Sequence, residues 1–453
     1  MPNENNPRFG LLTLSCVVVA SMIGSGVFTT SGFSLAALAS PVSVLAAWIV
    51  GGLIALSGAI AYGQLARILP ISGGEYLYLS RRLHPAAGFL AGWVSLTAGF
   101  SGAIAMAALA FESYAFNENR PNWLPPQLTA ALLIATFGLG HAFLVRIAAA
   151  LQNAIVLLKL VVLALFLIIA ALKIPSHPWS WSALPAPPGA PPTASWNQIQ
   201  LFAESVMWIS LSYAGFNAAI YIASEVRQPE KTVPRSLWIG TLLVTILYLL
   251  LNAVFVTAVP ASQIAGQERV AAIAAGALGG TPLQNLVRIA VCLGTLSSVA
   301  GMIMTGPRVF SRMADDGLFP HWFRSGNSAT ARTVLLQTAI AILLLCWTDL
   351  RGLLGYLSPL LALSSALTVA TLLLPQTPGS TQAAADVKPQ SPLITAVAAF
   401  YVLATLLTAT LLASRDLRNL AGTAITLAIG IGLWFLTASR QKHRSYPSGT
   451  SRD

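Results

Sequence analysis

The chain has 453 residues, of which 56% are hydrophobic and only 9% are charged. A soluble protein of this size carries about 25% charged residues, so the composition excludes an ordinary soluble domain and predicts a helical membrane protein with several spans. The formal net charge of +11 does not indicate a nucleic acid partner, because the basic residues are scattered between apolar runs and form no block.

Twelve apolar segments have the length needed to cross a bilayer. They cover residues 11–38, 42–69, 84–115, 127–146, 149–172, 198–223, 234–258, 283–312, 331–348, 353–374, 393–413 and 418–438. Twelve spans place both termini on the same side, and most of the Lys and Arg residues lie in the tails and loops on that side. The positive-inside rule therefore predicts an integral protein of the cell (inner) membrane with both termini in the cytoplasm.

The first apolar run contains Gly24-Ser25-Gly26 near its middle. Two glycines around a serine are poor helix formers, so the pattern predicts a break in this helix. Irregular backbone in lipid persists only where protein, water or a ligand satisfies its polar groups, and the N–H groups that open the second half-helix suit a carboxylate. The alternative is that these small residues only let another helix pack closely.

The sixth apolar run contains a second candidate break, Ser212-Tyr213-Ala214-Gly215-Phe216-Asn217. Spans one and six hold corresponding positions if spans one to five and six to ten are two halves of the chain. Paired interrupted helices at corresponding positions are typical of transporters with inverted repeats and a binding site at the membrane midplane.

Lys159 lies in the fifth apolar run, about ten residues from its predicted start and so roughly 15 Å deep at 1.5 Å per residue. A charge at that depth is costly, which makes this lysine a functional candidate. The alternative is that the span begins later and that the side chain reaches the interface. Glu204 is the one acidic residue that we expect near the breaks, about half a helix outward of the site, whereas Glu225 closes span six on the cytoplasmic side.

Nothing in the sequence predicts a metal site or another cofactor. The three cysteines lie singly inside apolar runs, and no GxxxxGK[ST] loop for ATP is present. A channel would show several polar rings along its pore, and a membrane enzyme would need clustered His, Asp, Glu or Cys. The chain shows neither pattern, so we expect no enzymatic activity.

Four motifs in the chain are similar to those of the amino acid-polyamine-organocation superfamily of amino acid permeases. They are IGSGVF at 23–28, PISGGEYLY at 70–78, SEVRQPEKTVPR at 224–235 and MADDGLFP at 313–320. The resemblance implies an all-α membrane protein with twelve transmembrane helices and a five-plus-five inverted-repeat (LeuT-like) core with broken helices 1 and 6. The core would cover 11–374, between a cytoplasmic tail at 1–10 and a cytoplasmic linker at 375–392. Helices 11 and 12 would cover 393–438, before a cytoplasmic tail at 439–453.

The resemblance also implies a set of site residues. The N–H groups around Ser25, Gly26 and Val27 would hold a substrate carboxylate, and the carbonyls of Ile23, Leu211, Ser212 and Ala214 would accept from its ammonium. Gly24 and Asn217 belong to the same breaks. Many relatives carry an aromatic gate where this chain has Leu211, so Tyr213 or Phe216 is expected to occlude the site. Lys159 would replace the sodium ion of sodium-coupled relatives, near Gly24 and the hydroxyls of Ser297 or Ser298.

These observations predict a secondary active transporter of neutral amino acids, working by alternating access with sodium-independent, proton-coupled uptake. An amino acid exchanger is one alternative, and a transporter-like sensor that binds without transport is another. The expected partners are a small-molecule amino acid, protons as coupling ions and the lipid bilayer. The substrate amino acid, the need for an accessory subunit and the oligomeric state stay open.

Overall fold

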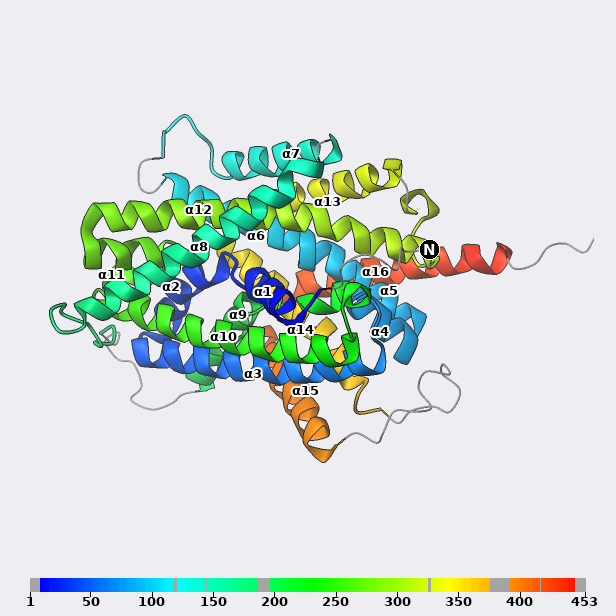
Figure 1. The fold of residues 1–453 in the computed structure, drawn as a ribbon, viewed down its shortest axis with the longest axis horizontal. Coiled ribbons are helices and arrows are strands. Elements are labelled where there is room, and N and C mark those ends of the chain that lie inside the picture. The colour runs from blue at the N-terminus through cyan, green and yellow to red at the C-terminus, as the bar shows by residue number, and fades with distance from the viewer. Residues whose placement is uncertain are drawn as a thin grey trace, which may run out of the picture.

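The computed structural model describes residues 9–116, 120–143, 145–185, 196–324, 327–374, 391–415 and 417–444. Within these ranges every regular element is a helix, and the one strand-like pairing is an isolated bridge between Phe9 and Val226. The predicted all-α class is therefore confirmed, with the long helices lying side by side (Figure 1). Most of the predicted tails and of the linker 375–392 lies outside the described residues.

Seven described stretches are long and apolar enough to cross a membrane. They are α3 (Pro41–Ile68), the continuous α5 (Pro85–Val94), η1 (Ser95–Gly102) and α6 (Ala103–Phe116), residues 155–173 of α8 (Val145–Lys173), α10 (Pro229–Thr257), α12 (Val270–Asp315), α14 (Leu350–Ala370) and α15 (Pro392–Ala413). The pair α1 (Leu11–Met22) and α2 (Gly26–Leu38) makes an eighth. Shorter apolar stretches lie in α7 (Leu128–Phe143), α13 (Asn327–Trp347) and α16 (Leu417–Arg444).

The first span breaks where the sequence predicts it. Helix α1 ends at Met22, α2 begins at Gly26, and the two are bent by 43°. Ile23 leaves the helical region, with φ −75° and ψ 79°, so that the next N–H, from Gly24, bonds to the Met22 carbonyl over only two residues. The predicted break in span one is therefore present.

The sixth span breaks at the second predicted position. Helix α9 (Trp196–Ser212) stops at Ser212, and residues 213–217 form turns before the 3-10 helix η2 (Ala218–Glu225). Gly215 has φ +100°, a backbone conformation that glycine adopts without the steric cost a side chain would add. The chain can therefore turn at this point and resume as a tighter helix.

Residues of the two broken spans take part in two apolar clusters. One cluster packs residues of α1, α3 and α10, and it includes Ile23 and Val27. The other packs residues of α6, α13 and α14, and it includes Leu211 of α9 and Phe33 of α2. The broken spans thus contribute side chains to both clusters.

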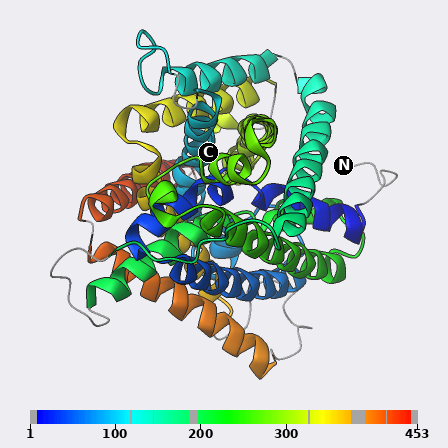
Figure 2. The same ribbon diagram turned by 90° about the vertical axis from the view of Figure 1, so that its left-hand side faces the viewer.

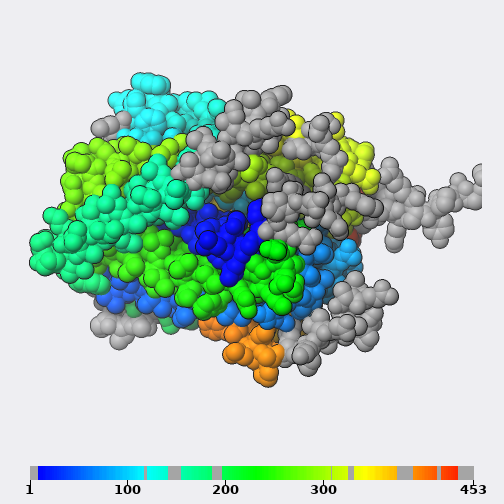
Figure 3. All heavy atoms as spheres, in the orientation of Figure 1, coloured from blue at the N-terminus to red at the C-terminus, as the bar shows by residue number. Residues whose placement is uncertain are grey.

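Helix α1 lies between α8 and α10 and reaches the molecular surface there (Figure 3). Its residue Leu12 is 79% exposed, as expected for a helix face turned toward lipid. Helices α15 and α16 lie at the edge of the molecule (Figure 2), α15 against α3, α9 and α14, and α16 against α5 and α14.

A short pairing links the two broken spans at the ends predicted to be cytoplasmic. The Phe9 N–H donates to the Glu225 carbonyl at 3.0 Å, and the Arg227 N–H donates to the Phe9 carbonyl at 3.2 Å. Phe9 precedes α1 and Val226 follows η2, so these bonds tie the start of span one to the end of span six.

Candidate functional site

The two breaks touch one another. A Cβ added at Gly26 would lie 2.4 Å from the Ser212 Oγ, and one added at Gly215 would lie 2.8 Å from the Ser21 carbonyl oxygen. The hydroxyls of Thr30 and Ser212 are 3.0 Å apart and hydrogen-bonded. Glycine at positions 26 and 215 therefore permits a contact between two irregular backbones that any side chain would obstruct.

Tyr248 of α10 joins the same two breaks. Its buried hydroxyl donates to the Met22 carbonyl at 2.6 Å and lies 3.2 Å from the Ser212 carbonyl, so one proton serves an acceptor at each break. One turn along α10, Asn252 accepts from the Ser31 hydroxyl at 2.5 Å. Uncompensated carbonyls in an apolar interior cost free energy, and this network supplies donors for two of them.

Lys159 reaches the first break from α8. Its Nζ donates to the Ile23 carbonyl at 2.5 Å, and the side chain is 3% exposed. The stem crosses Gly294 of α12, where an added Cβ would lie 2.8 Å from the Lys159 Cδ. No hydrogen bond to Ser297 or Ser298 is recorded in the described part of the chain, and the Ser298 hydroxyl instead donates to the Gly294 carbonyl at 3.0 Å.

Both breaks also present backbone groups suited to a zwitterion. The N–H groups of Gly26 and Val27 open α2, where a helix offers no acceptor of its own, and Ser25 precedes them. On the other break, the Leu211 carbonyl accepts from the Ala214 N–H at 3.0 Å. Each carbonyl keeps a second lone pair, so the carbonyls of Ile23 and Ser212 also retain capacity to accept.

The aromatic residues of the second break pack against α3 and α10. Tyr213 packs edge-on against Trp48, with ring centroids 5.7 Å apart, and at a tilt against Tyr248, with ring centroids 5.1 Å apart. Phe216 packs against Tyr62 at 5.6 Å. The residue at the expected gate position, Leu211, instead joins the other apolar cluster.

One turn before Leu211 on α9, Trp208 is buried against α2 and α14. Its ring packs edge-on against Phe33 of α2 at 6.4 Å, and the guanidinium of Arg351 lies over it at 5.5 Å. A cavity of about 510 Å³ lies beyond this ring and is lined in part by Trp208, Glu204 and Arg351. Glu204 pairs with Arg415 at 3.4 Å, outward of both breaks.

On the other side of the breaks, Asn217 connects span six to a carboxylate that the sequence analysis did not single out. Its Nδ2 lies 3.4 Å from Oε1 of Glu75, the first residue of α4 (Glu75–Arg82). The sequence places Glu75 only in a loop motif, and nothing in it indicates that α3, α14 and span six meet there. Tyr248 was missed for the same reason, since a tyrosine in an apolar run reads as packing.

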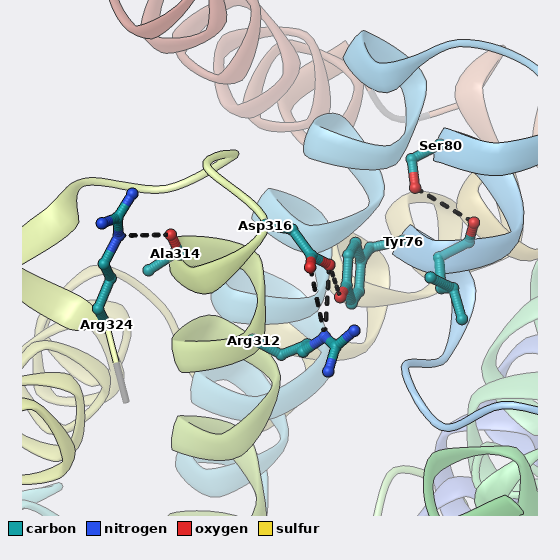
Figure 4. A network of polar contacts seen from close by, with 7 residues as sticks. Tyr76, Ser80, Arg312, Ala314, Asp316 and Arg324 are labelled. Carbon is teal, nitrogen blue, oxygen red and sulfur yellow. Dashed lines mark hydrogen bonds and ion pairs between the residues drawn. The ribbon is translucent and has the colours of Figure 1, made fainter. Parts of the chain in front are cut away.

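The loop motifs at 70–78 and 313–320 contact one another. The Tyr76 hydroxyl donates to Asp316 at 2.7 Å, and Arg312 pairs with Asp316 at 3.4 Å (Figure 4). Tyr76 belongs to the motif at 70–78 and Asp316 to the motif at 313–320. Helix α4 is thereby fixed to the end of α12.

Comparison with known proteins identifies the family. A family model described as amino acid permease matches residues 9–445. The human large neutral amino acids transporter small subunit 2 is 30% identical over 370 residues, covering 80% of this chain and 68% of the relative. The mouse b(0,+)-type amino acid transporter 1 is 26% identical over 361 residues, covering 77% and 72%. The mouse Asc-type amino acid transporter 1 is 24% identical over 328 residues, covering 69% and 59%.

The match spans all the described helices, so both breaks, Lys159 and these two loop motifs fall inside it. The resemblance to the amino acid-polyamine-organocation superfamily is confirmed by it. This chain belongs to the amino acid permease family and is a membrane transport protein rather than an enzyme.

Proposed function

We propose that this protein is a secondary active transporter of neutral amino acids that works by alternating access. The observation that carries the proposal is the contact between the two helix breaks, with the buried Lys159 ammonium bonded to one of them. Twelve spans with cytoplasmic termini, a core at 11–374 and helices 11 and 12 at 393–438 complete the proposed architecture. Rocking of one group of helices against another would expose the breaks to each side of the membrane in turn.

The substrate amino acid is held by backbone at both breaks. Its carboxylate accepts from the N–H groups of Ser25, Gly26 and Val27, at the positive end of the α2 dipole. Its ammonium donates to the carbonyls of Ile23, Leu211, Ser212 and Ala214. Lys159 and Glu75 are the two charged groups for which the described residues record hydrogen bonds to break residues, and both are engaged there. A neutral substrate side chain therefore fits best, in agreement with the human relative named a large neutral amino acids transporter.

Lys159 takes the place of a coupling sodium ion. Its ammonium donates to the carbonyl of Ile23. In sodium-coupled transporters, carbonyls at an unwound helix coordinate the sodium ion in the same way. Transport is then independent of sodium. Release of the Lys159 proton during the cycle would couple uptake to protons. If Lys159 stays charged throughout, the protein would exchange one amino acid for another, which is the second candidate function.

The test is uptake of alanine, serine and leucine into sodium-free proteoliposomes, with and without internal amino acid and with an imposed pH gradient. Wild type and Lys159→Ala are compared with Lys173→Ala, which removes an exposed lysine from the end of the same helix. We expect sodium-free uptake in wild type and Lys173→Ala, and a loss of at least about tenfold in Lys159→Ala, equivalent to about 1.4 kcal/mol.

The pattern of uptake separates the candidates. Stimulation by external acid without internal substrate supports proton-coupled uptake, and a requirement for internal amino acid supports exchange. Binding without any uptake would leave a sensor. An absolute sodium requirement, or full activity in Lys159→Ala, would remove the role assigned to this lysine.

A further inference from the structure

Glu75 is a buried carboxylate whose bonding partners are all uncharged. Its side chain is 8% exposed at the start of α4. Oε1 accepts from the Tyr62 hydroxyl at 2.5 Å and from Asn217 at 3.4 Å, and Oε2 accepts from the Ser364 hydroxyl at 2.5 Å. These donors come from α3, from the turn that follows the break of span six, and from α14. One carboxyl group therefore ties three separate elements together.

Gly74, which precedes Glu75, allows the turn that positions this carboxylate. Gly74 has φ +68° and ψ −155°, and a Cβ there would lie 2.2 Å from the ring of Tyr221 on η2. The turn therefore brings α4 directly under span six. The N-terminus of a helix also favours a negative charge at its first residue.

The titratable groups around Glu75 are tyrosines. Tyr62 of α3 donates to Glu75, the ring of Tyr221 on η2 lies against Gly74, and Tyr401 of α15 donates to Ser365, next to Ser364. Tyr78 lies on α4 itself and is buried. The nearby cations of the described chain are directed elsewhere: Arg67 and Arg81 are exposed, and Arg82 donates to the Thr371 carbonyl at 3.0 Å.

The Glu75 carboxyl can form hydrogen bonds in both its ionised and its neutral form, but the two forms differ in how strongly they accept from Asn217. The ionised carboxylate accepts charge-assisted bonds from Tyr62, Asn217 and Ser364. The neutral acid accepts weaker bonds, by about half, and must donate its own proton to a hydroxyl such as Tyr62 or Ser364. The amide nitrogen of Asn217 only donates, so protonation of the carboxyl replaces its charged acceptor with a weaker neutral one. Burial raises the pKa of the Glu75 carboxyl, and hydrogen bonds from Ser364 and Tyr62 lower it in part.

We propose that Glu75 is a proton-binding site that controls the inner half of span six. Ionised, it holds Asn217 against α3 and α14 and keeps the inner side of the breaks closed. Protonated, it releases Asn217, and η2 separates from α4. Because Tyr76 keeps α4 fixed to the end of α12, the released motion belongs to span six. The inference rests on the proposed transport function for its physiological meaning, but the proton site itself is testable without substrate.

The test combines two substrate-free readouts on the full chain in detergent. Infrared difference spectra between acidic and alkaline pH follow the carboxyl C=O stretch. In a background with Cys16, Cys292 and Cys346 replaced by serine, Ala219→Cys places a thiol on a fully buried site of η2, and its labelling by a water-soluble maleimide reports opening. Labelling at each pH is divided by the rate for the unfolded protein, which removes the titration of the thiol itself.

We expect one carboxyl band to titrate with the same midpoint as the labelling, and labelling to increase on acidification. Glu75→Gln removes the band, and its labelling rate at every pH equals the rate that wild type reaches at acidic pH. Ser364→Ala and Tyr62→Phe each remove a donor to the carboxylate, so they shift both midpoints to higher pH by about one to two units. Glu225→Gln removes an exposed carboxylate at the end of η2 and leaves both midpoints unchanged.

Unchanged pH dependence of labelling in Glu75→Gln, or unmoved midpoints in both donor variants, would overturn the proposal. The two donor variants keep it testable if Glu75→Gln does not fold. Failure of the transport proposal would show differently, as absent amino acid binding and uptake in wild type while the carboxyl titration and its link to labelling persist.

Discussion

The two helix breaks meet at one place but are stabilised by different chemistry. The break of span one is held by a cation, because Lys159 donates directly to the Ile23 carbonyl. The break of span six is held by backbone shape and neutral donors, through Gly215 and the Tyr248 hydroxyl, and it leads inward to the carboxylate of Glu75. The breaks therefore lie between a positive and a negative group that do not pair with each other.

This difference separates two tasks. A cation on the first break can organise an anionic group of a ligand and respond to its arrival. A carboxylate beyond the second break is held only by uncharged donors, so its strength of attachment depends on its own protonation. Substitutions that act on one break or on the contact between them test whether this separation holds.

The largest effect is expected at Gly215. Alanine there would carry a side chain at φ +100°, about 1–2 kcal/mol in strain, and would overlap the Ser21 carbonyl, about 1–3 kcal/mol more. We expect Gly215→Ala to lower the unfolding midpoint and abolish transport, measured by thermal unfolding in detergent and by uptake. Gly24→Ala is the matched control, because a Cβ there meets only the Met22 carbonyl, at 3.9 Å. Equal stability of the two variants would contradict the contact.

The next effect is expected at the residue that serves both breaks. Tyr248→Phe keeps the ring but removes the hydroxyl that donates to the Met22 and Ser212 carbonyls. Two buried acceptors lose a donor, so stability should fall by about 1–3 kcal/mol. Chemical denaturation followed by intrinsic fluorescence measures the change. A variant as stable as wild type would show that the two breaks do not depend on this bridge.

A pH-dependent effect is expected from Glu75, because burial raises the pKa of its carboxyl above the ordinary 4.5. The folded chain then binds this proton more tightly than the unfolded chain. The stabilisation is fully present below the ordinary pKa and is lost as pH rises through the raised pKa. The unfolding midpoint of wild type should therefore fall relative to Glu75→Gln over that window. A constant difference between the two proteins would show that Glu75 does not change its charge there.

The smallest effect is expected at Thr30, whose hydroxyl bonds to Ser212 across the contact. Thr30→Val removes one neutral hydrogen bond and should cost about 1 kcal/mol, whereas Thr30→Ser keeps the hydroxyl and should cost less. Thermal unfolding of the two variants, side by side, measures this. If serine is the more damaging substitution, the methyl group rather than the hydroxyl matters at this contact.

The positions of the breaks and the depth of Lys159 could be predicted because each depends on a local cost. Gly24 and Gly26 interrupt an apolar run, and a charge such as Lys159 is expensive wherever its partner lies. The pairing of spans one and six followed from their corresponding positions in two halves of five spans each.

The directions of Tyr213 and Phe216 could not be predicted in the same way. A broken segment has no fixed period, so the sequence does not say which face each side chain occupies. The partners of Glu75 come from positions 62, 217 and 364, and only the assembled fold brings them together. Tyr248 likewise acquires its role from two carbonyls that are free only because other segments break.

The pairing of Phe9 with Glu225 and Arg227 limits how the inner ends can move. Two backbone hydrogen bonds join the start of α1 to the end of η2. A displacement of either end is therefore transmitted to the other. We therefore expect the segments on this side of the breaks at Ile23 and Gly215 to move together. A proton at Glu75 that releases η2 would thereby also displace α1, whose break Lys159 holds through the Ile23 carbonyl.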